Sequence, residues 1–122
     1  RTLDYSQRLR DHSRAALATA EKSTGRVLFE GVAKGGAQAT ARDAGAIAPG
    51  RLADLMALDT AHIDLEGRAG DTLLDAFIFA ADDRAISDVW AAGRHLVSGG
   101  EHVQHQAITE AYRRVLKRLT TL

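Results

Sequence analysis

The sequence predicts an α/β fold, with helices toward both ends and a few short strands between them. Three observations lead to this prediction. Residues 104–122 place apolar side chains at helical spacing. Two apolar segments within 86–98 flank Ala92-Gly93, a dipeptide typical of a tight hairpin turn. The turn signal Pro49-Gly50 leads into the short apolar run 55–58, which predicts a strand.

Length and composition limit the classes of protein to which the chain can belong. Its 122 residues suffice for one compact domain with a modest core. The 16 basic residues balance the 16 acidic ones, so nothing indicates nucleic acid or an anionic membrane as a partner. The chain has no cysteine, which excludes a thiolate metal site and fits a cytoplasmic location. No apolar run approaches the roughly 20 residues that a membrane-spanning helix needs.

The first segment, residues 1–21, predicts a helix with one apolar and one charged face. No capping residue precedes Leu3, and the chain opens on Arg1 rather than on Met. We therefore expect the helix, and the protein, to begin upstream of Arg1. The apolar face consists of Leu9, Ala16, Leu17 and Ala20.

A second helix is predicted over 25–39, with Ser23 or Thr24 as its N-cap. Each glycine inside a helix costs about 1 kcal/mol relative to alanine. A helix that carries several of them is expected to press closely against a neighbouring element. The glycines in question are Gly31, Gly35 and Gly36.

The middle of the chain changes to turns and short elements. Asp54 directly precedes the strand 55–58, and we expect its carboxylate to accept backbone N–H bonds from the incoming loop. Residues 60–70 predict a loop. Asp71 is a candidate N-cap for a short helix over about 71–80, with a strand over 76–80 as the alternative. The apolar face of that helix consists of Leu73, Leu74, Phe77 and Ile78.

Two strands, 86–91 and 94–98, and a final helix over 104–122 complete the chain. In the hairpin we expect Val89, Ala91, Leu96 and Val97 to be buried, with Trp90 on the face opposite Val89. The helix carries an apolar stripe of Ile108, Ala111, Tyr112, Val115, Leu116 and Leu119. Its basic residues predict a solvated face near the C-terminal end; these are Arg113, Arg114, Lys117 and Arg118.

The residues that might carry chemistry favour structural roles. His102 and His105 could meet on one helical turn, but a metal site needs a third ligand, and none is predicted nearby. The other histidines, His12, His62 and His95, are expected at the surface. In Asp82-Asp83-Arg84 the acidic pair is expected to cap a turn rather than to perform acid–base catalysis. The glycine pairs at 35–36 and 99–100 lack the context of a phosphate-binding loop.

A family resemblance covers essentially the whole chain. The stretch Ala44 to Asp59 is similar to the return strand of the amidohydrolase superfamily, in which the chain leaves a barrel and enters a small β-domain. Two further stretches resemble formimidoylglutamate deiminases more specifically. They are Leu3-Asp4-Tyr5-Ser6-Gln7-Arg8-Leu9, and Asp71-Thr72-Leu73-Leu74-Asp75 through Phe79-Ala80-Ala81-Asp82-Asp83-Arg84 into Asp88-Val89-Trp90-Ala91-Ala92-Gly93-Arg94.

The resemblance implies the C-terminal part of a metal-dependent TIM-barrel hydrolase of histidine degradation. Such enzymes convert N-formimino-L-glutamate and water into N-formyl-L-glutamate and ammonia, through a zinc-activated hydroxide. In that family the metal ligands are a His-x-His pair, two later histidines and an Asp that ends the eighth barrel strand. No residue of this chain matches them, so we assign no catalytic, cofactor-binding or metal-binding residue and expect the fragment alone to be inactive and to bind no zinc.

The same resemblance divides the chain into three parts. Residues 1–43 correspond to the outer helices that end the (β/α)8 barrel. Residues 44–103 correspond to strands of a small β-sandwich domain, with a short helix near 71–80, and 104–122 to a C-terminal helix. The implied partners are the missing N-terminal barrel portion, a small-molecule substrate and a second copy in a homodimer. Without the barrel portion we expect unpaired strands, exposed apolar faces and poor solubility or self-association.

Two alternatives stay open. The chain could end a different amidohydrolase, an aminohydrolase or chlorohydrolase that acts on a ring such as guanine or a triazine. It could also be a non-catalytic interaction module, which the strong terminal helix and the lack of a site would suit. Only the similarity over 71–94 separates the first alternative from the deiminase.

Overall fold

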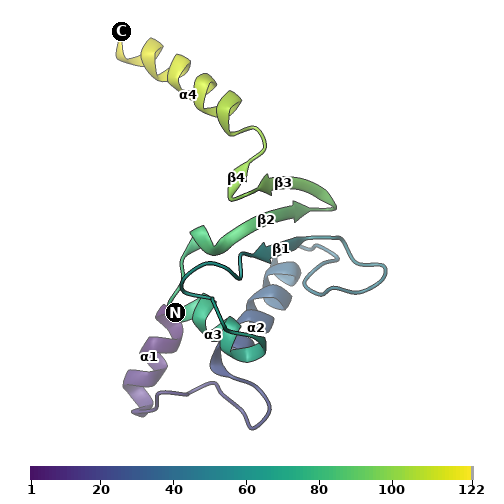
Figure 1. Cartoon of the computed structure of the whole chain (residues 1–122), viewed down its shortest axis with the longest axis vertical. Coiled ribbons are helices and arrows are strands. Elements are labelled where there is room, and N and C mark those ends of the chain that lie inside the picture. The colour runs from purple at the N-terminus through teal and green to yellow at the C-terminus, as the bar shows by residue number, and fades with distance from the viewer. Residues whose placement is uncertain (122) are drawn as a thin grey trace.

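The computed structural model describes residues 1–121 of the chain and places helices on either side of a small sheet (Figure 1). The helices of residues 1–80 lie together at one end, and the last helix projects from the sheet at the other end. In chain order the elements are α1 (Thr2–Asp11), α2 (Thr24–Ala39), β1 (Leu55–Leu58), α3 (Gly70–Phe79), the 3₁₀ turn η1 (Asp83–Ala85), β2 (Ile86–Ala91), β3 (Arg94–Ser98), β4 (Glu101–His102) and α4 (His105–Thr120).

The sheet is an antiparallel meander in the order β1-β2-β3-β4. β1 pairs with β2, with Met56 opposite Val89. The expectation of unpaired strands is therefore wrong for β1 and β2, although β1 still forms one edge of the sheet. The hairpin of β2 and β3 has the predicted bounds, and its turn residues Ala92 and Gly93 both have positive φ, 50° and 77°. The two-residue strand β4 was not predicted.

A small core lies beneath the sheet and α3. Its fully buried centre is Leu65, which belongs to the turns that follow β1, and Ala76, Ala81 and Ala85 surround it. Leu73 and Phe77 of α3 pack against these residues, together with Leu58 of β1. The predicted loop over 60–70 thus supplies the largest fully buried apolar side chain, because successive turns fold it back onto α3.

The first helix is shorter than predicted. α1 ends at Asp11, and His12 takes a left-handed conformation with φ 51°, which stops the helix. Residues 14–17 form turns, and the Ser13 hydroxyl accepts a bond from Ala15 N–H at 3.3 Å. Of the predicted apolar face, Leu9 is 79% exposed and Ala16 and Leu17 are only half-buried, so the face gains little burial that would extend the helix.

The second helix begins as predicted, but its glycines do not lie where a close contact was expected. Ser23 is the N-cap, and its hydroxyl accepts the Arg26 N–H at 3.2 Å. Apart from the helix's own backbone and the adjacent residues, a Cβ on Gly31, Gly35 or Gly36 would meet no atom of the described chain within 4 Å. The close contact is made by Gly25 instead, against Asp75 of α3.

The structure confirms the predicted ranges of the last two helices within the usual uncertainty of helix ends. α3 is a helix rather than a strand, but its N-cap is Ala69, so the prediction that Asp71 caps it is wrong. The hydroxyl of Thr72 donates to the Ala69 carbonyl at 2.8 Å and closes the first turn. α4 has no buried residue, and its apolar stripe is exposed. Of the helices described over 1–121, none is both long and apolar enough to cross a bilayer.

Candidate functional site

A groove of about 590 Å³ lies between α2, the loop that follows it, and the strands β1 and β2. Phe29, Met56 and Trp90 supply its large apolar side chains, while Arg42 and Asp54 supply an ion pair. The groove is an open depression in which apolar side chains predominate. Because apolar side chains and charged groups meet in it, the groove is a candidate binding site.

The ion pair in the groove joins the α2–β1 loop to the hairpin. Arg42 Nε and Nη2 each donate to the Asp54 carboxylate at 2.7 Å, in a bidentate geometry. Asp54 Oδ1 also accepts the Ala92 N–H at 2.7 Å, and Gly93 N–H donates to Ala53 O at 2.9 Å. Asp54 was predicted to bind backbone N–H groups of the incoming loop. Its backbone donor is instead Ala92 in the β2–β3 turn, which lies beside Asp54 because β1 pairs with β2.

These contacts keep Asp54 ionised. The Arg42 guanidinium, and secondly the Ala92 N–H, hold the pKa of the Asp54 carboxyl below its usual value. Asp54 and Arg42 are twelve residues apart, so no local sequence pattern could reveal the pair. A carboxylate committed to two guanidinium bonds and one amide bond is suited to holding loops together rather than to moving protons.

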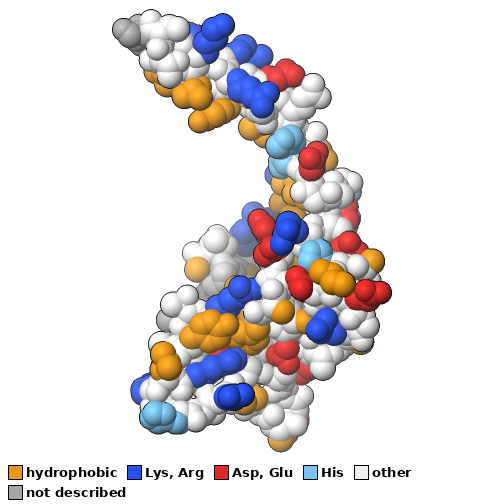
Figure 2. All heavy atoms as spheres, turned by 60° about the vertical axis from the view of Figure 1, so that its left-hand side comes forward, with side chains coloured by type: hydrophobic (Ala, Val, Ile, Leu, Met, Phe, Trp, Pro, Cys, Tyr) orange, Lys and Arg blue, Asp and Glu red, His pale blue; other side chains and the backbone are white. Residues whose placement is uncertain are grey.

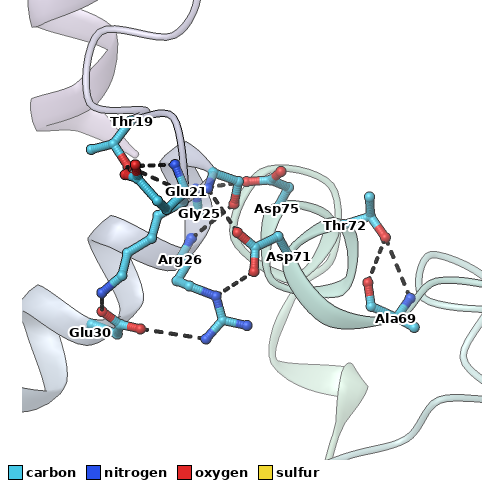
Figure 3. A network of polar contacts seen from close by, with 11 residues as sticks. Thr19, Glu21, Gly25, Arg26, Glu30, Ala69, Asp71, Thr72 and Asp75 are labelled. Atoms are coloured by element: carbon cyan, nitrogen blue, oxygen red, sulfur yellow. Dashed lines mark hydrogen bonds and ion pairs between the residues drawn. The ribbon is translucent and has the colours of Figure 1, made fainter.

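A second polar network joins the start of α2 to α3 (Figure 3). Asp71 accepts the Ser23 N–H at 2.8 Å and pairs with the Arg26 guanidinium. Asp75, one turn further along α3, accepts the Gly25 N–H at 2.7 Å. The two carboxylates thus bind N–H groups that an α-helix leaves without partners at its first turn.

The chemistry of this network is also structural. The Ser23 N–H, and secondly Arg26, lower the pKa of the Asp71 carboxyl. A Cβ at Gly25 would lie 2.5 Å from Asp75 Oδ1 and 2.7 Å from the Asp75 Cα, so only glycine allows this approach of α2 to α3. Two carboxylates four residues apart are visible in the sequence, but their partners lie 48 and 50 residues away.

A buried acid that the sequence did not single out lies in α1. The side chain of Asp4 is fully buried, and its Oδ2 lies 2.6 Å from Arg8 Nε in a geometry that does not direct an N–H at the oxygen. The Arg8 guanidinium lies over the rings of Phe79 and Tyr5, 4.7 and 5.4 Å from their centroids. Arg8 thus packs α1 against the end of α3.

Asp82 of the acidic pair at 82–83 has the predicted structural role. Asp82 is the N-cap of η1 and accepts the Arg84 N–H at 3.0 Å. The Arg84 guanidinium also binds the Asp82 carboxylate. This bond is the main reason that the pKa of Asp82 is lowered.

The contacts of His95 and His102 are with nearby backbone, ring and carboxylate groups. His102 Nδ1 accepts the Gln104 N–H at 3.1 Å, while His105 opens α4. His95 stacks on Trp90 with centroids 4.6 Å apart, and its Nε2 lies 2.8 Å from Asp88 Oδ1. Across residues 1–121 no group of three or more His, Cys, Asp or Glu side chains is arranged to hold a metal ion.

His62 corrects one expectation. It was predicted at the surface, but its side chain is only 18% exposed. The His62 carbonyl accepts N–H bonds from Leu65 and Glu66, at 2.8 and 2.9 Å, so the turn that buries Leu65 draws His62 inward as well. His12, by contrast, is exposed at the end of α1.

The described carboxylates therefore bind backbone N–H groups and basic side chains and hold them in place. The pKa values of Asp54, Asp71, Asp82 and Asp88 are all lowered by hydrogen bonds, which favours the ionised form and opposes a role as proton donor near neutral pH. That the chain carries no catalytic residue stays a prediction. The groove is open, and its carboxylate, Asp54, is already bound to Arg42, which suits contact with protein better than transformation of a small molecule.

Comparison with known proteins relates the chain to longer ones. No protein-family model matches the sequence. Formimidoylglutamate deiminase from Pseudomonas aeruginosa is 40% identical over 120 residues, which make up 98% of this chain and 26% of that protein. A solved amidohydrolase from Brucella melitensis has 39% identity and a TM-score of 0.77, over 97% of this chain and 26% of its own. The chain thus spans about a quarter of the length of these relatives.

Both comparisons agree with the likeness predicted from the sequence motifs, and the match runs over nearly every residue, from α1 to α4. The part of the solved amidohydrolase that superimposes is its C-terminal part. In sequence and in fold, this chain resembles the C-terminal part of an amidohydrolase, and formimidoylglutamate deiminase is the named relative whose sequence it shares over 98% of its length.

Proposed function

We propose that this chain is the C-terminal portion of a hydrolase that deiminates N-formimino-L-glutamate to N-formyl-L-glutamate and ammonia in histidine degradation. The observation that carries the proposal is the 40% identity to formimidoylglutamate deiminase over 98% of the chain. Identity spread over almost the whole chain argues for a common architecture rather than for one shared motif. The cytoplasm is the proposed location.

In this proposal the chain is a scaffold for a catalytic barrel that lies outside it. Residues 1–43 would close the barrel and 44–103 would form part of the small β-domain, with 104–122 as the terminal helix. The open edge of β1 supports this role, since an edge strand can pair with a further strand. The groove beside that edge would receive the side chains of the added strand, and Ile47, 92% exposed at its rim, would be covered.

The resemblance implies zinc, but the residues of this chain do not fit a zinc site. A catalytic zinc needs three protein ligands, and no such group is present over 1–121. The described carboxylates nearest the groove are already bound to arginine and backbone. We therefore derive no catalytic step for this chain and place the metal, the substrate and the reaction in the remainder of the proposed enzyme.

Two measurements test the proposal. The first is the intact mass of the natural protein, expected to be about four times the 13.1 kDa of this chain, because the chain spans 26% of its relative. The second is ammonia release from N-formimino-L-glutamate, before and after removal of metal with a chelator and after restoration with zinc. Metal-dependent release is the expected result.

Other outcomes have distinct meanings. A long protein that releases ammonia only from guanine or a triazine would refute the proposed substrate and favour the ring-deaminase alternative. A natural protein of 13.1 kDa without turnover would contradict the enzyme proposal and favour an interaction module. The proposed inactivity of this chain is tested in the same assay with the 122-residue chain alone.

A further inference from the structure

Two aromatic rings and a carboxylate meet on the β2–β3 hairpin. The register of the hairpin sets Trp90 of β2 opposite His95 of β3. The two rings stack, with their centroids 4.6 Å apart and their planes inclined by 11°. His95 Nε2 lies 2.8 Å from Oδ1 of Asp88, which is on the same strand as Trp90. Figure 2 shows histidine and acidic side chains beside hydrophobic ones at the level of the sheet.

The contact with Asp88 fixes which nitrogen of the imidazole carries the proton. The Ser87 hydroxyl, and secondly His95, hold the pKa of the Asp88 carboxyl below its usual value, so Asp88 is ionised above about pH 5. An ionised carboxylate only accepts hydrogen bonds, so Nε2 is the protonated nitrogen of the neutral ring. A further proton therefore enters at Nδ1 and makes the ring a cation. The His95 side chain is 40% exposed, so solvent delivers this proton.

The charged groups of the adjoining strands favour a cation at this position. β2 and β4 are the strands that flank β3. Successive side chains of a strand point to opposite faces, so His95 and Arg94 lie on different faces of the sheet. On β4 the register places His102 on the face of Arg94, and the acidic Glu101 on the face of His95. The charged residues that share the face of His95 on these strands are thus the acids Asp88 and Glu101.

We propose that His95 is a proton-dependent latch that holds Trp90 in place. With the added proton, the imidazolium makes a cation–π contact with the face of the indole and an ion pair with Asp88. Without it, ring stacking and one hydrogen bond remain. Trp90 is one of the residues that line the groove between α2 and the sheet. The latch therefore makes this wall of the groove firmer near pH 5 than near pH 8, the interval in which imidazole groups exchange their protons.

The strength of the contact determines what must be measured. An exposed cation–π contact changes the ratio of stacked to unstacked indole by about two- to fivefold. Asp88 contributes by holding the imidazole at the indole through Nε2 as well as by its charge. A change of this size alters the motion and the solvent access of the indole without unfolding the sheet. The measurement must therefore report on Trp90 itself.

Collisional quenching of tryptophan fluorescence by acrylamide tests the latch. Trp90 is the one tryptophan of these 122 residues, and the whole natural protein is used with tryptophans elsewhere replaced by phenylalanine. The quantity compared is the Stern–Volmer constant divided by the fluorescence lifetime, so that direct quenching of the indole by an imidazolium does not enter. We expect this collisional rate constant to be about two- to fivefold larger at pH 8 than at pH 5. Equal values at the two pH values would overturn the proposal.

Three variants assign the effect to the latch. His95→Phe keeps an aromatic stack but exchanges no proton, so its rate constant should be the same at both pH values. Asp88→Ala removes the acceptor that holds Nε2, so most of the pH dependence should be lost. His102→Gln is the matched control, because it removes a histidine on the other face of the sheet, and it should keep the full pH dependence.

The outcomes of the variants separate the latch from other titrating groups. A pH dependence that persists unchanged in His95→Phe or in Asp88→Ala, or that disappears in His102→Gln, would overturn the proposal. Circular dichroism checks that each variant folds. None of these readouts uses enzymatic activity, so the inference stands or fails independently of the proposed function.

Discussion

Gly25→Ala tests the contact between α2 and α3. The new Cβ would lie 2.5 Å from Asp75 Oδ1, 2.7 Å from the Asp75 Cα and 2.7 Å from the Asp75 nitrogen. Two of these atoms are backbone, so a side-chain rotation does not relieve the clash and the helices must separate. Overpacking of this kind costs about 1–3 kcal/mol. Separation also weakens the bond from Gly25 N–H to Asp75, now 2.7 Å long.

The same substitution at Gly35 is the matched control. It lies in the interior of the same helix, and apart from the helix's own backbone and the adjacent residues the described chain has no atom within 4 Å of a Cβ there. Alanine should therefore stabilise the chain by about 0.5–1 kcal/mol, since it loses less conformational entropy in a helix than glycine.

Urea denaturation, followed by far-ultraviolet circular dichroism, measures both changes. We expect the midpoint to fall for Gly25→Ala and to rise for Gly35→Ala, with unchanged slopes. A Gly25→Ala midpoint equal to or above that of the parent would refute the argument from the close approach. If Gly35→Ala were destabilising in a longer natural protein but not in the 122-residue chain, the glycine face of α2 would be covered by the remainder of that protein.

Three further predictions concern local contacts. Asp54→Asn should lower stability at neutral pH: the folded pKa of Asp54 lies below its ordinary value, so its contribution is complete above the ordinary pKa of about 3.9 and is lost as pH falls through the folded value. In the variant, the free energy of unfolding should therefore fall less steeply below about pH 4. An unchanged pH dependence below pH 4 would contradict a stabilising ion pair between Asp54 and Arg42. Ser23→Ala should cost about 1 kcal/mol in urea denaturation, because the cap of α2 loses its bond to the Arg26 N–H, whereas an unchanged midpoint would mean that Asp71 alone suffices. Ala92→Asn should raise the free energy of unfolding by up to about 1 kcal/mol, since Ala92 has φ 50° and asparagine adopts that conformation more readily; a decrease would show that the turn is constrained in another way.

Short-range patterns account for the elements that were predicted well. The hairpin has its predicted bounds because Ala92-Gly93 and the flanking apolar residues specify turn and register within a few positions. The start of α2 at Ser23 rests on a capping bond to a residue three positions away. Helix α4 follows from a periodic stripe that needs no partner to be recognised.

The predictions that failed depended on contacts between distant segments. Leu9 and its neighbours have helical spacing, yet a helix over 1–21 would need an apolar surface to cover them, and α1 stops at Asp11 instead. The glycines of α2 suggested a close contact, but only the position of α3 shows that Gly25 makes it and that Gly35 does not. Aspartate is a common N-cap residue, and Asp71 lies near the start of α3, yet it binds the first turn of α2 instead.

The polar contacts of the candidate site divide in the same way. Asp82 caps a turn two residues away, and that bond could be inferred from the chain alone. The bond from Asp54 to the hairpin turn spans 38 residues and exists because β1 pairs with β2. The amino-acid sequence specifies turns, caps, periodic faces and the family likeness, because each depends on neighbours along the chain. Folding in three dimensions selects which carboxylate meets which amide and which apolar face stays open, because those contacts join segments that only packing brings together.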